Sequence, residues 1–420
     1  MSGIPHYNHC TKEFLLTVLY FFKRKNAKFL LEKKMTIQEA FEDIKDDRID
    51  RCKKHLLSDI LMIVFLGVLC GYKSIEEIHF NAELSEGTLK KYLKLENGIP
   101  GSDTMLRVLA RIDSKQFEKV FVKYVRETFS SNLPENEVLA IDGKTIRHSE
   151  YNPDNGEKRP HKASHVVSAW AHSMGLCLGQ VKTEEKSNEI TAIPELLELL
   201  DLKGVIVTID AMGCQKKITE KISEKKSEYV ISLKGNQGKI HEDAKALFSH
   251  ELDEKYCERY KIQYTEGQTE IGHGRIEKRK CYLCTNLNWL QEKDDWANLN
   301  GIGMVVCKRI QKKTGEKSVE RRYFLTSLKD AGKAAASLRA HWSIENNLHW
   351  VLDVLLNEDS CLVRKDNSAQ NLNIIRKFVL NILKQVDFSD IVRSKNIALK
   401  NKQKLCDKRE DCLQRVLNFL

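Results

Sequence analysis

The chain has 420 residues, 41% of them hydrophobic and 30% charged, which is typical of a soluble protein of two or three domains with a substantial core. Its 12 cysteines follow no framework, which argues against a small disulfide-stapled scaffold and predicts reduced thiols and a cytoplasmic location. Lys and Arg total 69 against 59 acids, so the formal net charge is +10. An excess of this size permits binding to a polyanion without requiring it.

Two apolar stretches are too short to span a membrane. Residues 14–22 and 60–69 are about nine and ten residues long, whereas a spanning helix needs roughly 18 to 20. Three basic residues follow the first stretch, and no small-residue cleavage site marks it as a signal peptide. We therefore expect buried helices and no membrane partner, with residues 1–35 as an N-terminal extension.

Residues 36–132 show helical patterning throughout and predict a compact bundle of four to six helices. Polar residues that can cap a helix N-terminus precede the predicted helices: Thr36, Ser58, Ser85, Ser102 and Ser114. Short helices joined by tight turns are compatible with a helix-turn-helix unit in a DNA major groove. They are equally compatible with a domain that only buttresses the rest of the protein, and both interpretations stay open at this point.

Residues 133–250 alternate between strands and helices. Strands are predicted at 138–141, 165–171, 176–181, 205–209 and 229–233, and helices at 188–200, 215–223 and 239–248. Residues 172–175 join the second and third strands in a hairpin, and Pro194 fits its helix only in the first turn. The order βββαβαβα is the ribonuclease-H-like arrangement, with Asp142 on the first strand and Asp210 after the fourth. If those strands are neighbours, the two carboxylates come together.

A third acid, Glu345, lies far downstream in residues 341–354. Apolar residues recur here at the spacing of a helix: Trp342, Leu348, Leu352 and Leu355. Trp342 and Trp350 are eight residues apart and fall roughly on one helix face, which favours a place in the core. Residues 331–390 include a further helix, at 367–386, and complete the core, while residues 391–420 form a basic C-terminal tail.

Residues 251–330 lie between Asp210 and Glu345 and predict a β-rich insertion before the helix that carries Glu345. Strand-like stretches lie near 259–265, 276–283, 303–310 and 319–326. Cys281 and Cys284 form the only close cysteine pair, with His273 upstream. A zinc site needs four ligands, and no second pair stands near, so we interpret both cysteines as strand residues.

Two strand-end aspartates and a helical glutamate are what a pair of divalent cations needs. Mg²⁺ and Mn²⁺ prefer hard oxygen ligands, and two such ions can stabilise both the attacking and the leaving oxygen of a phosphoryl displacement. Each acid also has an ordinary explanation, as a turn residue, a helix cap or a solvated side chain. The combination of the three, in this order and on these elements, favours the metal site.

Seven stretches form an ordered pattern along the chain: AIDGKTIR (140–147), HVVSAWA (165–171), EKSNEITAIPELLELLDLKG (185–204), VTIDAMGCQK (207–216), YVISLKGNQ (229–237), GHGRIEKR (272–279) and RAHWSIENNLHWVLDVLLNED (339–359). In them the chain resembles the DDE transposases of bacterial insertion sequences, in the branch that includes the H-repeat-associated proteins of Rhs elements. The resemblance covers most of the chain after residue 50. It implies a ribonuclease-H-like core on which Asp142, Asp210 and Glu345 are the catalytic acids.

The resemblance departs from the wider group around Glu345. That group often has Tyr, Arg and Lys at offsets that fall here on Leu338, His341 and Leu352. Arg339, His341 and Asn346 are the candidates to replace those contacts. Together with basic and polar residues near the aspartates and in the insertion, they complete the predicted DNA-binding set: Lys144, Arg147, Lys234, Asn236, His273, Arg275, Arg339, His341 and Asn346.

We therefore predict an α/β (α+β) fold with a ribonuclease-H-like mixed sheet, a helical N-terminal domain that binds DNA, and the β-rich insertion. The predicted function is a DNA transposase that binds insertion-sequence ends and cuts and joins DNA with two Mg²⁺ or Mn²⁺ ions. Expected partners are double-stranded DNA, as terminal inverted repeats and as target, and a second copy of the chain in synapsis, in the cytoplasm at the nucleoid. The alternatives are a metal-dependent nuclease without strand transfer and a non-catalytic, transposase-derived DNA-binding protein.

Overall fold

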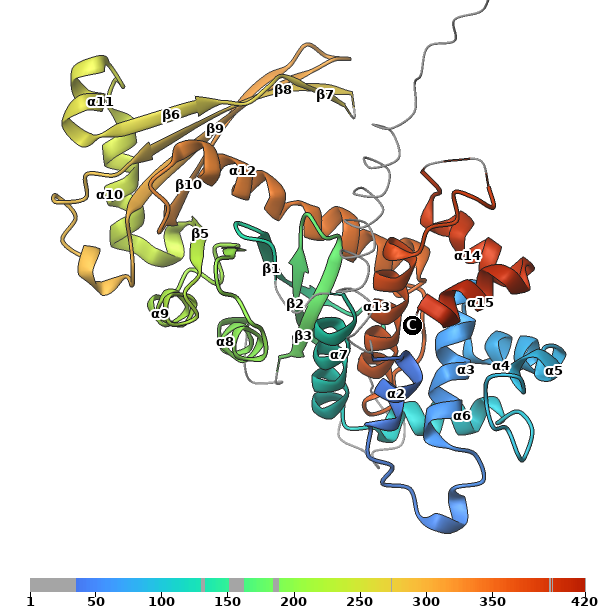
Figure 1. The fold of residues 1–420 in the computed structure, drawn as a ribbon. Helices are drawn as coiled ribbons and strands as arrows, with labels where there is room; N and C mark the ends of the chain where they lie inside the picture. Colours follow the sequence, from blue (N-terminus) through green and yellow to red (C-terminus); the bar gives the residue numbers. More distant parts are fainter. Residues whose placement is uncertain are drawn as a thin grey trace, which may run out of the picture.

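The computed structural model describes residues 35–129, 133–150, 162–183, 189–272, 274–392, 394 and 396–419. The apolar stretch at residues 14–22 and nearly all of the predicted N-terminal extension lie outside these ranges. The fold is a mixed α/β architecture in which helices flank one large sheet (Figure 1).

Five strands form the ribonuclease-H-like half of the sheet: β1 (Val138–Thr145), β2 (His165–Ala171), β3 (Leu176–Lys182), β4 (Ile206–Ile209) and β5 (Glu228–Leu233). Their spatial order is β3-β2-β1-β4-β5. β1, β2 and β3 pair antiparallel, whereas β4 and β5 run parallel to β1. The predicted hairpin and the predicted fold are therefore confirmed.

The predicted β-rich segment does not form a separate sheet. Its strands are β6 (Ile262–Glu266), β7 (Glu270–Gly272), β8 (Arg275–Cys284), β9 (Gly301–Gln311) and β10 (Lys317–Thr326). β10 pairs antiparallel with β5, with Tyr323 opposite Leu233, so the sheet continues without a break to ten strands. β6, β8 and β9 lie on one side of the molecule, away from the N-terminal helices (Figure 1).

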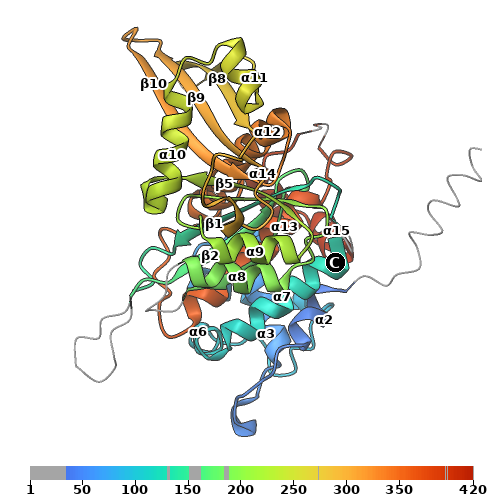
Figure 2. The same cartoon turned by 90° about the vertical axis from the view of Figure 1, so that its left-hand side faces the viewer.

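Several helices cover the sheet: α8 (Glu189–Leu199), α9 (Lys216–Glu224), α10 (Gly238–Ser249), α11 (Glu254–Tyr260) and α12 (Ala331–His341). α8 lies against β2 and β3 and next to α9 (Figure 2), and α12 contacts β1, β4 and β5. Leu139, Ala140 and Ile141 of β1 are all fully buried, as expected of a central strand covered on both faces.

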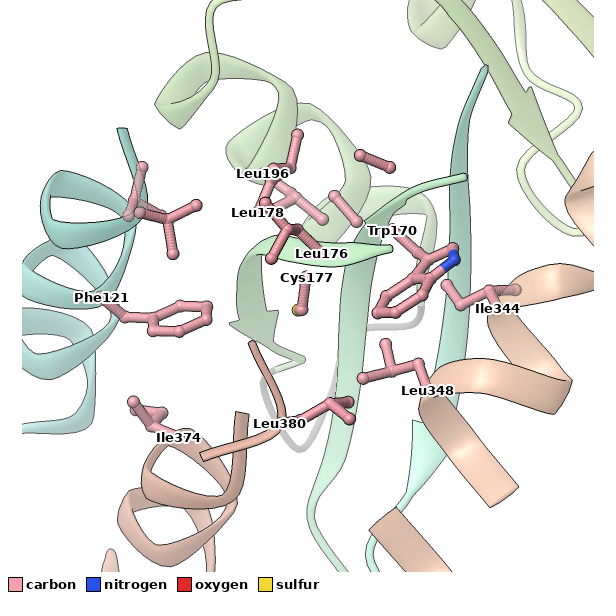
Figure 3. Close-up of a cluster of buried hydrophobic side chains, with 14 of the residues drawn as sticks. Phe121, Trp170, Leu176, Cys177, Leu178, Leu196, Ile344, Leu348, Ile374 and Leu380 are labelled. Carbon is pink, nitrogen blue, oxygen red and sulfur yellow. The ribbon is translucent and has the colours of Figure 1, made fainter. Parts of the chain in front are cut away.

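The N-terminal helices pack around one C-terminal helix. They are α2 (Ile37–Glu42), α3 (Leu57–Cys70), α4 (Ile75–Leu84), α5 (Glu86–Leu89), α6 (Ser102–Arg111) and α7 (Ser114–Phe129), besides the short 3₁₀ turn Asp50–Cys52. α13 (Ser368–Gln385) contacts α3, α6, α7 and β3, and its residues 368–383 are buried. Phe378 of α13 meets Phe121 of α7 edge to face, with ring centroids 4.8 Å apart. Figure 3 shows Phe121 and Ile374 converging with Leu178 of β3, so the bundle and the sheet share one hydrophobic core.

The C-terminal tail also joins this core. α14 (Leu399–Lys408) lies against α3, and α15 (Glu410–Phe419) packs on α14. The Tyr72 hydroxyl donates to Asp407 Oδ1 at 2.6 Å, and Gln403 Nε2 donates to the Val68 carbonyl at 3.0 Å. The last helices therefore hold the end of α3, far away in the sequence.

Most of the predicted helix caps are wrong. Thr36 does form a capping box with Glu39. Ser58, Ser102 and Ser114 are already helical, and Ser85 precedes α5 without a side-chain cap. Ser114 instead donates to Asn371 Oδ1 of α13, a tertiary partner that local sequence does not reveal. Pro194 likewise lies one turn inside α8, where the burial of Ile193 and Leu196 holds the helix in place.

The apolar stretch at residues 60–69 lies within α3 and is buried, as predicted. Across the described ranges, no single helix is long and apolar enough to cross a membrane; α3 and α4 meet the length and composition test only as a pair bent by 98°.

Candidate active site

Asp142 and Asp210 lie side by side on the sheet. β1 and β4 are parallel neighbours, with Ile141 opposite Ile209, and each aspartate is the next residue along its strand direction. Neighbouring strands are about 4.8 Å apart. The pairing that would bring the two carboxylates together is therefore present.

The Asp142 carboxylate lies in an unusually acidic environment. Its Oδ1 accepts a hydrogen bond from the Gly143 N–H at 3.0 Å, and His349 Nδ1 lies 3.6 Å from its Oδ2. Burial raises the pKa of Asp142 to about 7, and the negative charges of Asp210, Glu189 and Glu345 add to the rise.

Asp210 is held by the turn that follows it. Its Oδ1 accepts hydrogen bonds from the N–H groups of Met212 at 2.9 Å and Gly213 at 3.3 Å. Burial raises the pKa of Asp210, and Glu189 raises it further, while the nearby Lys234 lowers it. Asn236 Nδ2 donates to the Ala211 carbonyl at 2.7 Å, which ties the turn to the end of β5.

Glu345 begins an irregular helix rather than the regular one that the spacing predicts. α12 ends at His341, and two π-helical segments follow, η4 (Glu345–His349) and η5 (Val351–Leu355). Ile344 and Leu348 lie against Trp170 of β2, which anchors the segment on the sheet (Figure 3). Single π turns inside helices are frequent at functional sites. Glu345 is exposed, although partial burial of its carboxylate raises its pKa. The positive charge of Arg322 opposes that rise.

The two tryptophans near Glu345 are not core residues, so that prediction is wrong. Trp342 is 39% exposed and Trp350 is 59% exposed. The π turns change the angular spacing along the helix, so that Ile344, Leu348 and Leu352 bury instead. The Arg322 guanidinium lies over the Trp342 ring, 5.3 Å from its centroid.

The predicted DNA-binding residues fall into different environments. Lys144 pairs with Asp353 at 2.5 Å and with the buried Glu358. Arg147 pairs with Asp359 at 3.0 Å and stays largely exposed. His341 shares a hydrogen bond with Thr208 Oγ1 at 3.0 Å, and burial lowers its pKa to about 4, so the neutral ring anchors α12 to β4.

The remaining members of the set lie nearer the surface. Lys234 is exposed beside Asp210, and Asn346 Nδ2 donates to the Trp342 carbonyl at 3.2 Å. Arg275 pairs with Glu277 at 2.8 Å, and Arg339 pairs with Glu270 of β7 at 2.8 Å. Arg339 thus links α12 to the outer strands. His273 lies outside the described residues.

Two residues at the centre were missed by the sequence reasoning. Glu189 is the first residue of α8, and its Oε1 lies 2.8 Å from His165 Nε2. His349 lies one turn beyond Glu345, and burial lowers its pKa to about 3, so it is neutral beside Asp142. An acid at a helix start and a histidine in an apolar helix carry no distinctive signal by themselves. Only the neighbouring aspartates make them notable.

The donor set suits a hard divalent cation. Within the described ranges, no group of three or more His, Cys, Asp or Glu side chains is arranged around one point as a metal cluster. A pair of ions shared between acids does not require such a cluster, and carboxylate oxygens are the ligands that Mg²⁺ and Mn²⁺ prefer. Besides burial, repulsion from neighbouring acids raises the pKa of Asp142, and a bound cation would relieve that repulsion. Cys281 and Cys284 are buried free cysteines within β8.

Comparisons with known proteins give a consistent picture. A family model described as "Transposase DDE domain" matches residues 133–382, and one described as "DDE_Tnp_1-associated" matches residues 38–125. The chain is 42% identical over 369 residues to "Putative transposase YncI" of Escherichia coli O157:H7, covering 85% of this chain and 90% of that protein. It is 40% identical over 354 residues to "H repeat-associated putative transposase YhhI" of Escherichia coli K12, covering 83% of this chain and 90% of that protein.

Among solved structures, the chain is similar to a piggyBac transposase synaptic complex with hairpin DNA. The match has a TM-score of 0.42 and 11% sequence identity, and it covers 91% of this chain and 77% of that one.

Proposed function

The chain belongs to the family of transposases with a DDE domain, and from this we propose that it binds the ends of an insertion sequence and catalyses metal-dependent DNA cleavage and strand transfer. The observation that carries the proposal is the placement of Asp142 and Asp210 on paired parallel strands, with the charge of Glu345 acting on Asp142. Acids whose pKa values are raised by burial and by neighbouring carboxylates are candidates for a catalytic centre.

In this proposal Asp142, Asp210 and Glu345 hold two Mg²⁺ or Mn²⁺ ions. When bound, the ions stabilise the attacking and leaving oxygens of an in-line phosphoryl displacement. The Gly143, Met212 and Gly213 N–H groups orient the two aspartates. Burial and neighbouring acids raise the pKa of Asp142 to about 7, and a bound cation would favour its ionised form.

Exposed basic and polar side chains contact the DNA near the three acids. Lys234 lies beside Asp210, while Arg147, Arg275, Arg339 and Asn346 are exposed on neighbouring elements. The three arginines exchange their carboxylate partners for phosphate oxygens on binding. Lys144 takes no part in this contact, because its ammonium is held between Asp353 and Glu358.

The N-terminal helices recognise the terminal inverted repeats, and two copies of the chain bring two ends together in synapsis. The net charge of +10 supports a polyanionic partner. Strand transfer into target DNA then occurs at the same three acids.

The test is cleavage of a labelled DNA that carries the flanking element's own ends, with Mg²⁺ or Mn²⁺. We expect nicking at the element boundary by the wild type, and its loss in Asp142→Ala, Asp210→Ala and Glu345→Ala. Asp201→Ala, an exposed acid away from the centre, is the matched control and should cut normally.

Two results would overturn the proposal. Binding of the ends without cutting would favour the non-catalytic DNA-binding protein. Cleavage without joined products would favour the nuclease.

A further inference from the structure

Glu189 stands directly over the backbone next to Asp142. A Cβ atom added to Gly143 would lie 2.1 Å from Glu189 Oε1 and 2.5 Å from His165 Nε2. Contacts this short are not possible between non-bonded atoms, so residue 143 has to be glycine for the pair to lie where it does. The glutamate is therefore packed against the chain at the centre itself.

Two residues hold the Glu189 carboxylate in this position. Its Oε1 lies 2.8 Å from His165 Nε2, and the other nitrogen of that imidazole, Nδ1, lies 2.9 Å from Thr145 Oγ1. Thr145 of β1 and His165 of β2 are opposite each other in the sheet register. The strand pairing thus holds the His165 imidazole between Thr145 and Glu189 and fixes the position of the Glu189 carboxylate. His165 engages only one of the two carboxylate oxygens.

The position of Glu189 relative to both aspartates is consistent with this arrangement. Its negative charge acts on Asp142 and on Asp210. A helix N-terminus and one imidazole would be enough to explain an acid that only stabilises the fold. They do not explain why that acid lies against Gly143, where its charge disfavours the ionised forms of Asp142 and Asp210.

We propose that Glu189 supplies a fourth carboxylate to the cation-binding centre, and that Thr145 and His165 hold it over Gly143 for that purpose. The inference rests on the proposed function, because it assigns a further residue to the same ions. Asp142, Asp210 and Glu345 alone would offer three carboxylates to the cations. Glu189 adds a fourth, from the helix that packs against β2.

The test is binding of Mn²⁺ alone, measured by titration with electron paramagnetic resonance in the absence of DNA. Glu189→Gln is the decisive variant, since glutamine keeps the shape and can still accept from His165 while removing the charge. Glu195→Gln on the same helix is the matched control, because Glu195 is exposed and away from the centre. Circular dichroism and thermal unfolding confirm that each variant is folded.

We expect Glu189→Gln to weaken Mn²⁺ binding by about tenfold or more, with Glu195→Gln unchanged. Gly143→Ala should weaken it in the same direction, since the added methyl group displaces Glu189. Equal Mn²⁺ affinity in Glu189→Gln and wild type would overturn this inference and leave the DDE proposal standing. If the wild type binds no Mn²⁺ while Asp142→Ala behaves identically, the proposed function fails and this inference fails with it.

Discussion

Two carboxylates near β1 are both removed from solvent and yet have opposite electrostatic surroundings. The Asp142 side chain is 19% exposed, and its pKa rises to about 7 with burial and the charges of three other acids. Glu358 is fully buried, and burial alone would raise its pKa. The charges of Lys144 and Arg376 outweigh that effect and lower it.

The difference lies in what the protein supplies around each acid. Around Glu358 it provides its own cations and the Asn373 amide, so the charge is compensated in the folded chain. Around Asp142 it gathers further acids, so the charge stays uncompensated until something positive binds. Lys144 lies only two residues from Asp142 on the same strand and is directed to the compensated cluster. The following predictions test this contrast, from the largest expected effect on stability to the smallest.

Lys144→Met should cause the largest loss of stability. It leaves Glu358 buried without its main partner, and breaking a buried ion pair costs about 3 to 5 kcal/mol. Urea unfolding followed by circular dichroism measures the loss. The double variant Lys144→Met, Glu358→Met removes the orphaned charge as well and should recover much of it. A loss below about 1 kcal/mol for the single variant would mean that Glu358 is compensated without Lys144.

Asp142→Asn should stabilise the protein in the absence of divalent cations. The pKa of Asp142 is 3.8 in its ordinary state and about 7 in the fold, so the folded state favours the protonated form. Stability contributed by this group is therefore full below about pH 4 and is lost as the pH rises to about 7. Above pH 7 the variant should be more stable than wild type by up to about 4 kcal/mol, at about 1.4 kcal/mol per pKa unit.

Urea unfolding in EDTA at several pH values measures the Asp142 effect. The two proteins should converge below about pH 3, since the wild-type carboxyl is then protonated in both the folded and the unfolded state. A stability difference that does not change with pH would show that the charge of Asp142 is compensated within the protein.

Arg147→Ala should cost less than about 1 kcal/mol, although Arg147 is ion-paired like Lys144 and lies three residues further along. Its pair with Asp359 is largely exposed and is screened by water and salt. Thermal unfolding at low and high salt measures the difference. A loss of stability as large as that of Lys144→Met would show that the buried and the exposed ion pair contribute equally to stability.

Glu345→Gln should leave stability unchanged within about 0.5 kcal/mol, because the side chain is exposed. DNA cleavage should nevertheless fall by roughly 10³-fold, a loss of about 4 kcal/mol in transition-state stabilisation. The cleavage assay with element ends supplies the measurement. Normal cleavage by this variant would remove Glu345 from the catalytic set, and reduced stability would place it in the fold instead.

The amino-acid sequence by itself determined the strands that carry the two aspartates. Apolar, β-branched runs at residues 138–141 and 205–209 bury in a sheet whatever lies around them, and the alternation of strands and helices implies their order. The same local signals were enough to place Glu345 on a helix and α13 in the core.

Contacts between residues far apart in the sequence decided the features that local patterns do not predict. Glu189 lies against Gly143, where the pairing of β1 and β2 places His165 within 2.8 Å of its carboxylate. Lys144, one of the predicted DNA-binding residues, is ion-paired with Asp353 and Glu358, more than 200 residues away along the chain. The strands of the predicted insertion join the core sheet because β10 pairs with β5. Trp342 and Trp350 turn outward because the helix widens into π turns. Periodicity describes one element at a time, whereas burial and charge compensation depend on which elements meet, and that is set by tertiary packing.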